Sequence, residues 1–459
     1  MNYNLDTIVA ISTPPGYSGI SVIRLSGKNA PDLAKKHFML SKGSKLSDII
    51  PRKVYYGFFV NGDGEPLDEC LMIYMKSPNS YTGEDVIEFQ CHGGIIIPVK
   101  IVEELLKSRE MIRYAEPGEF TYRAFLNGRK DLTQAEAVES LIHSKTMFHQ
   151  KNALKQLSGY LGKKLKEYFN DFEDKRLFLE AAINFPDDVD EVYIDIEHKL
   201  KDFYEFLDKL TNSYKEAQPY ITGINAVIIG KPNVGKSSFM NLLLNNERVI
   251  VSPYPGTTRD VIEEEIILEG MPLKIIDTAG LRLTEDPIES IGIEKTREKL
   301  SQAQIIFSIF DASEPPTKED RDILDIIENR QNVFAILNKI DRGINNDIIK
   351  LIEGFNVKII KMSVLYGTGL DELKKVFKES IIKLYSLGEE RDFYLTSPRH
   401  YEIFLEMKEV VSKLLEGNPQ LEELLFALND LVLLYDKLIG RNVSDKDINQ
   451  IFSRFCIGK

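Results

Sequence analysis

Cysteine is scarce in this sequence, which has three cysteines among 459 residues. They are odd in number and lie far apart, at Cys70, Cys91 and Cys456. This pattern excludes a disulfide framework and a cysteine-rich metal site. We therefore expect a protein of a reducing compartment, namely the cytoplasm.

Positive charge and long hydrophobic runs are also lacking. Lys and Arg number 58 against 71 Asp and Glu, so the formal net charge is −13. Tight, sequence-independent binding of nucleic acid needs phosphate-neutralising cations, so an acidic chain leaves only a local basic patch for that purpose. No apolar run is long enough to span a bilayer. The first six residues lack the basic and apolar regions of a signal peptide, so we expect no membrane contact.

The chain is longer than one hydrophobic core usually organises, so roughly two to four domains are expected. From Thr7 to about Phe120, short apolar runs between turn residues predict a small mixed α+β domain. Residues 61–64, Asn-Gly-Asp-Gly, are a hairpin-turn signal. The expected elements are strands at 20–25, 54–60 and 71–75 and a helix near 97–108.

A helical period follows on both sides of a central segment. Apolar residues recur at three- and four-residue steps from Leu154 to Phe169. A further helix is expected over 194–214, closed by Gln218 and Pro219. After Arg391 the helical stripes return over 401–415 and 421–439. The two helical regions could form one discontinuous domain, or the second could be a separate C-terminal bundle.

Between residues 224 and 384, strands and helices alternate, which is typical of a mainly parallel sheet with helices on both faces. Phosphate sites in such folds lie at the carboxyl ends of the strands. The expected strands are 226–229, 264–268, 273–276, 305–310, 333–337 and 357–361.

The first of these strands runs into residues 230–237, Gly-Lys-Pro-Asn-Val-Gly-Lys-Ser, with the spacing G-x-x-x-x-G-K-[ST]. Such a loop turns its backbone N–H groups around a phosphate chain, and the next helix N-terminus adds partial positive charge. Lys236 is expected to reach the outer phosphates and the Ser237 hydroxyl to ligate Mg²⁺. Alone, the pattern also fits a glycine turn between a strand and a helix. The other expected loop contacts are Asn233, Val234, Gly235 and Ser238.

Two further segments follow in the order of a GTPase. Residues 256–260 read Gly-Thr-Thr-Arg-Asp, where Thr258 can close on Mg²⁺ and the terminal phosphate. Residues 277–280 read Asp-Thr-Ala-Gly after a strand. There Asp277 can hold a Mg²⁺-bound water and the Gly280 N–H can meet the γ-phosphate. The remaining expected nucleotide contacts in these segments are Ser252, Thr257, Thr278 and Ala279.

The base is read by Asn338-Lys339-Ile340-Asp341. The Asp341 carboxylate can accept hydrogen bonds from guanine N1–H and the 2-amino group, and adenine lacks this donor pair. A buried polar pairing of this kind discriminates by roughly 10⁴-fold, so the ligand is GTP or GDP. The stem of Lys339 is expected over the base plane. Each motif alone fits a polar turn, but four in order within one α/β unit exclude chance.

Two positions depart from the usual GTPase pattern. Leu281 occupies the place where Ras-like proteins have the glutamine that orients water, so hydrolysis must draw on another group. The last guanine-contact segment is Met362-Ser363-Val364 where Ser-Ala-Lys is usual. Ser363 is expected to supply a backbone N–H to the base.

With three further segments, these motifs resemble the family of bacterial tRNA-modifying GTPases known as MnmE or TrmE. The segments are residues 81–94, beginning Tyr-Thr-Gly-Glu-Asp, residues 117–128 around Pro-Gly-Glu-Phe-Thr, and the terminal Phe-Cys-Ile-Gly-Lys of 455–459. The likeness runs from Thr7 to Lys459.

The resemblance implies a multidomain fold: an N-terminal α+β folate-binding domain, a discontinuous α-helical domain, and an inserted Ras-like α/β G domain. It also implies a homodimer through the N-terminal domain and a heterotetramer with the FAD protein MnmG (GidA). Together the two proteins build a carboxymethylaminomethyl or aminomethyl group on C5 of the wobble uridine of certain tRNAs. The expected boundaries are 1–121 for the N-terminal domain, 122–220 and 385–459 for the helical domain, and 221–384 for the G domain.

The one-carbon unit comes from a folate such as 5-formyl-tetrahydrofolate. By resemblance, Arg24 and Lys459 offer cations to the folate, and Glu88 offers a carboxylate to the amino edge of its pterin. Arg129 is the fourth expected contact, although the family commonly has lysine there and Lys130 competes for the role. Without the resemblance, Arg24 and Glu88 read as an ordinary surface arginine and a solvated strand residue.

The resemblance also implies that K⁺ replaces the arginine finger of other GTPases. Asn233 is then a K⁺ ligand. Glu289 matches the glutamate that orients water, and otherwise reads as a surface helical residue. The resemblance implies that the C-terminal cysteine motif is needed for the modification, so Cys456 is a candidate for the tRNA chemistry, as nucleophile, acid or structural element. A cysteine near a chain end is less easily buried, and Lys459 beside it could favour the thiolate. The other expected K⁺ contacts are Ser252, Tyr254 and Thr257.

Two other functions fit part of this pattern. An RNA-binding assembly GTPase of ribosomes shares the Gly-Thr-Thr segment, but such proteins commonly append a basic RNA-binding module. A folate-responsive regulatory switch without chemistry of its own is the third reading.

Overall fold

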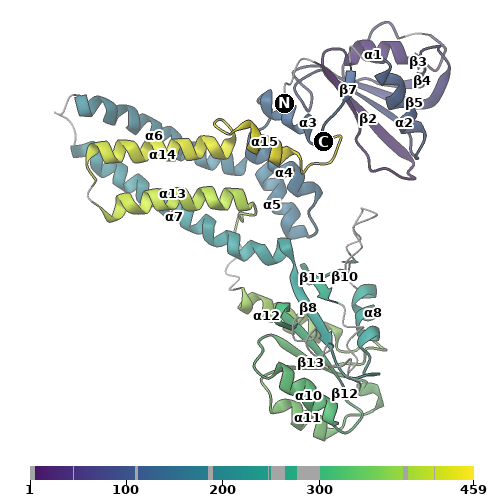
Figure 1. Cartoon of the computed structure of the whole chain (residues 1–459), viewed down its shortest axis with the longest axis vertical. Helices are drawn as coiled ribbons and strands as arrows, with labels where there is room; N and C mark the ends of the chain where they lie inside the picture. Colours follow the sequence, from purple (N-terminus) through teal and green to yellow (C-terminus); the bar gives the residue numbers. More distant parts are fainter. Residues whose placement is uncertain are drawn as a thin grey trace. The chain divides into compact units, whose positions relative to one another are not determined.

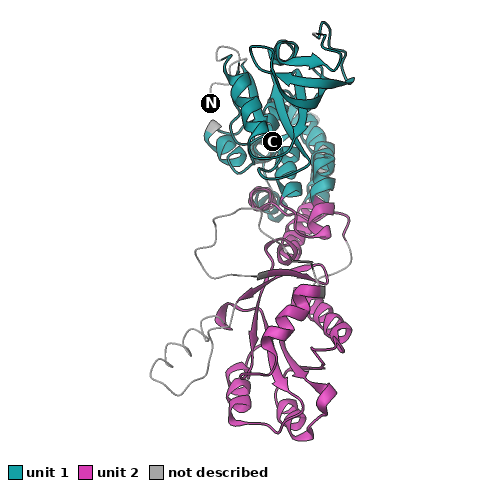
Figure 2. Ribbon diagram, turned by 90° about the vertical axis from the view of Figure 1, so that its right-hand side faces the viewer, with its two compact units in different colours: residues 1–142, 153–203, 409–459 teal, residues 143–152, 204–408 magenta. Residues whose placement is uncertain are grey.

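The computed structural model describes residues 6–44, 46–108, 112–184, 190–246, 248–249, 264–276, 300–385, 391–417 and 419–459. These residues form two compact units (Figure 2). The first unit comprises residues 1–142, 153–203 and 409–459, and the second comprises 143–152 and 204–408.

The N-terminal part of the first unit is a seven-stranded sheet in the order β3-β4-β5-β6-β2-β1-β7 (Figure 1). All neighbours are antiparallel except the β1–β7 pair, which is parallel. Helices α1 (Ala30–His37) and α2 (Ile97–Leu106) bury their apolar sides against it. The expected strands, hairpin and helix are confirmed. The strands are β1 (Thr7–Ile11), β2 (Ile20–Ser26), β3 (Phe38–Leu40), β4 (Val54–Val60), β5 (Pro66–Met75), β6 (Val86–His92) and β7 (Ile112–Tyr114).

Helices from distant parts of the sequence share the rest of the first unit. Helix α6 (Tyr160–Asn184) lies along α14 (Leu421–Ile439), and Phe169 stacks on Tyr435 with ring centroids 4.2 Å apart (Figure 1). This packing confirms one discontinuous helical domain. Among the described residues, no helix is both long and apolar enough to cross a membrane. The first unit also contains α3 (Glu119–Leu126), α4 (Leu132–Ile142) and α15 (Asp445–Phe452). Three further helices have residues in both units: α5 (Met147–Leu157), α7 (Asp190–Thr222) and α13 (Pro398–Glu416).

Two helix boundaries differ from the sequence prediction. The stripe from Leu154 to Phe169 belongs to two helices, because the chain turns at Gly159, where φ is +80°. Pro219 does not close α7, which continues to Thr222. A proline in a helix removes one N–H donor. Here the Thr222 hydroxyl donates to the Gln218 carbonyl at 2.9 Å.

The second unit contains the predicted α/β fold. Its sheet has the order β14-β13-β12-β8-β11-β10-β9, and the five strands from β14 to β11 run parallel. Separate apolar clusters cover its two faces, so the helices lie on both sides as expected. The elements are β8 (Ile224–Ile229), α8 (Lys236–Asn246), β9 (Arg248–Val249), β10 (Glu264–Leu268), β11 (Met271–Ile276), β12 (Ile305–Asp311), α10 (Lys318–Ile327), β13 (Val333–Asn338), a 3₁₀ turn (Ile340–Arg342), α11 (Asn346–Glu353), β14 (Lys358–Lys361) and α12 (Leu370–Leu384).

A buried ion cluster connects β7 to α3 in the first unit. The Glu119 side chain is 0% exposed, and both its oxygens accept hydrogen bonds from Arg113, at 2.7 and 2.9 Å. Arg123 donates to it at 2.8 Å. Burial alone raises the pKa of Glu119, but hydrogen bonds from Arg113, the Glu116 N–H and Arg123 outweigh burial and lower it. The Pro-Gly-Glu-Phe-Thr signature therefore contains a structural carboxylate.

Glu119→Gln should lower the free energy of unfolding of the first unit by about 3 kcal/mol at pH 7, because it leaves two guanidinium groups short of a buried partner. The pKa of folded Glu119 is lowered, so its stabilisation is complete above the ordinary glutamate pKa of about 4.3 and is lost as the pH falls through the folded value. The difference in free energy of unfolding between the native protein and Glu119→Gln should thus be constant from about pH 7 to 5 and shrink in stronger acid. Urea unfolding followed by circular dichroism measures it.

Glu103→Gln is the matched control. Its exposed carboxylate pairs with Lys100 at 3.1 Å, and such pairs contribute about 1 kcal/mol or less. Equal destabilisation by the two substitutions would show that the Glu119 cluster has no special role.

Candidate functional site

The phosphate loop joins β8 to α8 in the second unit. Asn233 and Gly235 have φ of +64° and +103°. A Cβ on Gly235 would lie 2.4 Å from Asn338 Nδ2, so glycine is required there. Lys236 Nζ donates to the loop carbonyls of Gly230 and Lys231 at 2.7 and 2.8 Å. This holds the ammonium group inside the curve of the loop, where burial lowers its pKa.

A second lysine anchors the loop from outside. Lys231 Nζ donates to Asp320 Oδ2 at 2.9 Å, and the Asp320 side chain is 1% exposed. Asp320 is also the third residue of α10 and caps its N-terminus together with Thr317. The sequence analysis missed this contact. Its signal was the Thr-x-x-Asp spacing of a capping box, which predicts a helix start but not its lysine partner.

Asn338 joins the loop to the base-reading segments. Its Nδ2 donates to the Val234 carbonyl at 2.7 Å. Its Oδ1 accepts from the backbone N–H groups of Val364, at 3.0 Å, and of Lys339, at 2.8 Å. The residue is 3% exposed. The amide predicted to contact GTP is thus used within the protein, where it fixes three loops relative to one another.

Asp341 is exposed beside the loop after β14. Its Oδ1 accepts a hydrogen bond from the buried Ser363 hydroxyl. The Ser363 N–H, which we expected to face the base, donates instead to the Thr368 carbonyl at 3.0 Å. Ser363 therefore supports the site through its side chain, because the turn back to Thr368 uses its backbone donor.

Lys339 is held by a carboxylate that the sequence analysis missed. Its Nζ donates to Asp311 Oδ2 at 2.6 Å. Asp311 is the last residue of β12 and lies in register with Asn338 of β13. Burial raises the pKa of Asp311, but hydrogen bonds from Lys339 and Ser313 outweigh burial and lower it. The sequence signal for this ion pair was an aspartate at the carboxyl end of the strand next to that of Asn338.

The described loops fit a guanine nucleotide. Lys236 provides a cation in the curve of the loop, Asp341 an exposed carboxylate, and Ser237 an exposed hydroxyl in the first turn of α8. Ser238 is exposed in the same turn. The other expected contacts lie outside the described residues: Ser252, Tyr254, Thr257, Thr258, Asp277, Thr278, Ala279, Gly280 and Glu289, together with Leu281.

A second polar cluster lies in the first unit. Arg24 and Glu88 face each other across β2 and β6, and Arg24 Nε donates to Glu88 Oε1 at 2.7 Å. The Arg24 guanidinium lies 5.8 Å from the ring centroid of Tyr81 and 5.7 Å from that of Phe120. The two expected folate contacts are therefore paired beside an aromatic wall.

The end of the chain completes this cluster. Gly458 has φ +92°, and a Cβ there would lie 2.7 Å from the Ile11 carbonyl of β1. Its own carbonyl accepts from Arg24 Nη1 at 3.3 Å and from the Ser12 hydroxyl at 3.1 Å. Burial and then Arg24 lower the pKa of Lys459, while Glu88 and Cys456 act in the opposite direction. Lys459 thus lies within electrostatic reach of the Arg24–Glu88 pair, and Cys456 lies within reach of Lys459.

Lys130, and not Arg129, reaches the aromatic wall. Lys130 Nζ lies 5.6 Å from the Tyr81 ring centroid. Burial, followed by the neighbouring charge of Arg129, lowers the pKa of Lys130. Arg129 itself is exposed. The cluster of Arg24, Glu88, Lys130 and Lys459 around Tyr81 suits a flat ligand with an amino edge and anionic groups, as a folate has.

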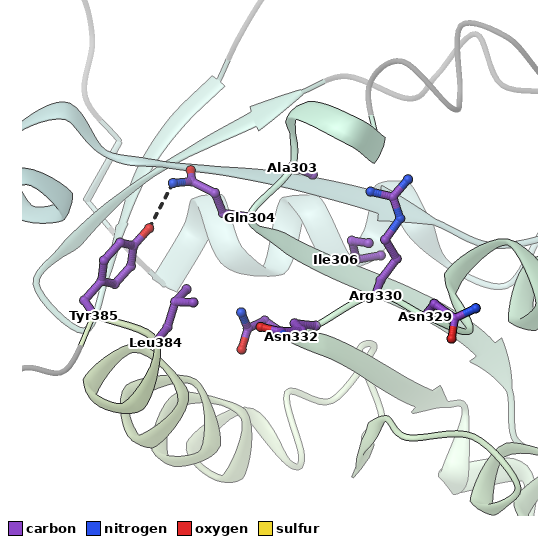
Figure 3. A pocket seen from close by; sticks show the side chains of 9 residues that line it. Ala303, Gln304, Ile306, Asn329, Arg330, Asn332, Leu384 and Tyr385 are labelled. Atoms are coloured by element: carbon purple, nitrogen blue, oxygen red, sulfur yellow. Dashed lines mark hydrogen bonds between the residues drawn. The ribbon is translucent and has the colours of Figure 1, made fainter.

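A separate hollow of about 320 Å³ lies at the opposite, amino-terminal ends of β12 and β13 (Figure 3). Gln304 Nε2 donates to the Tyr385 hydroxyl at 2.9 Å across it. It contains none of the predicted site residues, and phosphate sites in such folds lie at the other ends of the strands.

Two family models match consecutive parts of the chain. Residues 7–129 match the family described as GTP-binding protein TrmE N-terminus, and residues 132–456 match the MnmE helical domain. The crystal structure of the G domain of the T. maritima FeoB iron transporter is 25% identical, with a TM-score of 0.27, and the match covers 36% of this chain and 98% of that one.

Two relatives match over nearly their full length. The tRNA modification GTPase MnmE of Thermoanaerobacter pseudethanolicus is 40% identical, with 99% of each chain covered. The protein of the same description from Natranaerobius thermophilus is 41% identical at the same coverage. Because this identity extends over the whole length and both domain families match in order, the chain belongs to the family of the tRNA modification GTPase MnmE.

Proposed function

We propose that this protein is a K⁺-activated GTPase that, with the FAD protein MnmG, modifies C5 of the wobble uridine of certain tRNAs. The modification is a carboxymethylaminomethyl or aminomethyl group. One observation carries the proposal: the chain's terminal residues complete the Arg24–Glu88 cluster. A GTPase that only bound ribosomes would have no use for a folate-like site.

In this proposal, GTP is read by Asp341 and its phosphates are bound by residues 233–238. The support is the Asn338 amide, which fixes the phosphate loop against the Lys339–Asp341 segment. When bound, Mg²⁺ supplies charge neutralisation at the phosphates. Ser237 and Thr258 are the proposed Mg²⁺ ligands.

K⁺ is proposed to neutralise developing charge between the phosphates, as an arginine finger does elsewhere. Among the described residues, Asn233 is the proposed K⁺ ligand. Its left-handed backbone places it at the exposed rim of the loop. Ser252, Tyr254 and Thr257 are the proposed partners. Glu289 is proposed to orient the attacking water, since Leu281 has no polar atom for that task.

Arg24, Glu88 and Lys459 are proposed to bind 5-formyl-tetrahydrofolate or a related one-carbon folate. We propose Lys130 as the fourth contact because its ammonium group reaches the Tyr81 ring. Cys456 is proposed to take part in the tRNA chemistry, since it lies close enough to Lys459 to affect its pKa.

The proposed assembly is a cytoplasmic homodimer, joined through the N-terminal domain, in a heterotetramer with MnmG. The proposed domain boundaries are 1–121, 122–220, 221–384 and 385–459. GTP hydrolysis is proposed to move the G domain, while the tRNA chemistry occurs at the folate cluster. This separation is supported by the two sets of residues lying in different compact units.

Purified protein with MnmG, GTP, K⁺ and a one-carbon folate should modify wobble uridine in unmodified tRNA. Mass spectrometry of the nucleosides measures the product. Omitting this protein should abolish it. An unchanged product without this protein would reject the proposed function. Product formation without added folate would reject only the proposal that folate supplies the one-carbon unit. It would favour a regulatory switch at the Arg24–Glu88 cluster.

Asp341→Asn should weaken GTP binding by about 10³-fold or more, because an amide cannot accept both guanine hydrogen bonds. Affinity for xanthosine triphosphate should rise, since xanthine offers a carbonyl where guanine has the amino group. Titration with fluorescent nucleotides measures both affinities. The exposed Asp347→Asn is the control, and equal GTP affinity in the two variants would contradict the guanine role of Asp341.

Replacing K⁺ by Na⁺ should slow GTP hydrolysis by a factor of about 10 or more, because the smaller ion fits the proposed ligands poorly. Phosphate release at constant ionic strength measures the rate. In the same assay, Glu289→Ala should keep GTP affinity and lose hydrolysis. Equal rates in K⁺ and Na⁺ would remove the ion from the mechanism, and normal hydrolysis by the variant would remove Glu289.

A further inference from the structure

A lysine-rich stretch without acidic residues runs from His143 to Lys166. It contains six lysines and neither Asp nor Glu, although the whole chain has a net charge of −13. An excess of this kind within an acidic protein creates the local basic surface that nucleic acids require. The six lysines are Lys145, Lys151, Lys155, Lys163, Lys164 and Lys166.

Three of these lysines occupy the first two turns of α6 and are exposed: Lys163, Lys164 and Lys166. The opposite side of the helix is buried through Leu161 and Leu165. Lys164 lies 3.5 Å from Glu167. Within the described part of the chain, Lys163 and Lys166 have no carboxylate within ion-pair distance.

Helix stability does not account for these lysines. Positive charge near a helix N-terminus opposes the helix dipole, and the first turn of α6 has no acidic residue to offset it. Further along the same helix the charges are mixed, as in the Arg176–Glu180 pair at 2.8 Å. Mixed charges of this kind are typical of a solvated helix face. The lysines in the first two turns of α6 therefore serve another purpose.

The lysine surface borders the folate-like cluster. Gln134 Nε2 donates to the Leu157 carbonyl at 3.0 Å, which holds the turn between α5 and α6 against the start of α4. A Cβ on Gly162 would lie 2.8 Å from Asp131 Oδ2, so α6 approaches the residue that follows Lys130. Lys130 in turn lies over the Tyr81 ring.

An aromatic ring lies among the lysines. Tyr160, the first residue of α6, is half-buried, and Lys155 Nζ lies 4.6 Å from its ring centroid. Lysines beside an aromatic ring are the usual composition of surfaces that track a polynucleotide backbone and stack a base.

We propose that the surface formed by Lys155, Lys163, Lys164 and Lys166 binds the phosphate backbone of tRNA. This inference rests on the proposed function, because that function makes tRNA the substrate. The surface is suited to it by charge, by exposure and by its position beside the cluster where the target uridine must arrive. An acidic protein or an anionic membrane would be a different partner for the same charges.

The double variant Lys163→Glu/Lys166→Glu tests the surface in the full-length protein. Glutamate is favourable at the start of a helix, so the fold should be retained. Binding of fluorescent, unmodified tRNA should weaken at least tenfold at low salt. The slope of log affinity against log salt should become shallower by about 1.4 to 1.8, since each of the two lost phosphate contacts contributes about 0.7 to 0.9. Basal GTP hydrolysis should be unchanged.

Lys28→Glu/Lys42→Glu is the matched control, because both lysines are exposed in the same unit and the change in net charge is equal. Equal loss of tRNA binding in the two double variants, or none in the first, would overturn the proposal. So would binding of an anionic lipid vesicle, but not tRNA, by the native protein.

The same proteins separate this proposal from the proposed function. If the lysine variant loses tRNA binding but native protein with MnmG modifies no uridine, the surface stands and the proposed function fails. If the variant binds and modifies tRNA as the native protein does, the surface fails and the proposed function stands.

Discussion

The second unit depends on one buried amide. Asn338 donates to the phosphate loop at Val234 and accepts from Lys339 and Val364, so one side chain sets the positions of three loops. Gly235 has no room for a Cβ because that amide lies against it. An unpaired buried amide would cost about 1–3 kcal/mol for each lost partner. The distance between the phosphate-binding and base-reading parts of a nucleotide is thereby fixed before any nucleotide arrives.

The first unit shows a comparable constraint at the end of the chain. Gly458 fits against β1 only without a side chain, and its carbonyl receives Arg24. Arg24 is thus satisfied partly by Glu88 and partly by a residue 434 positions away. A site assembled in this way requires three segments distant in sequence, since β2, β6 and Gly458 each supply one part of it.

Charge is distributed unevenly over this acidic protein. The first turns of α6 are basic, whereas Asp6, Glu84 and Glu119 neutralise the arginines at the base of the N-terminal sheet. These paired acids, of which Glu119 is buried, hold the fold together, and the exposed lysines do not. This contrast is physical: a buried charge must be paired where it lies, whereas an exposed one is free to meet a ligand.

The sequence by itself determined the order of elements, the guanine-nucleotide motifs and the resemblance to the family, which implied the insertion of the G domain. Local spacing carries these features, because strand and helix periods and loop motifs depend on neighbouring residues. It misjudged Pro219, which lies inside α7 and does not end it, and the Ser363 N–H, which a turn uses. Only the tertiary structure joined Lys339 to Asp311, preferred Lys130 to Arg129 at Tyr81, and brought Gly458 to Arg24. These contacts join residues distant in sequence, and no local pattern encodes which distant partner a charged side chain meets.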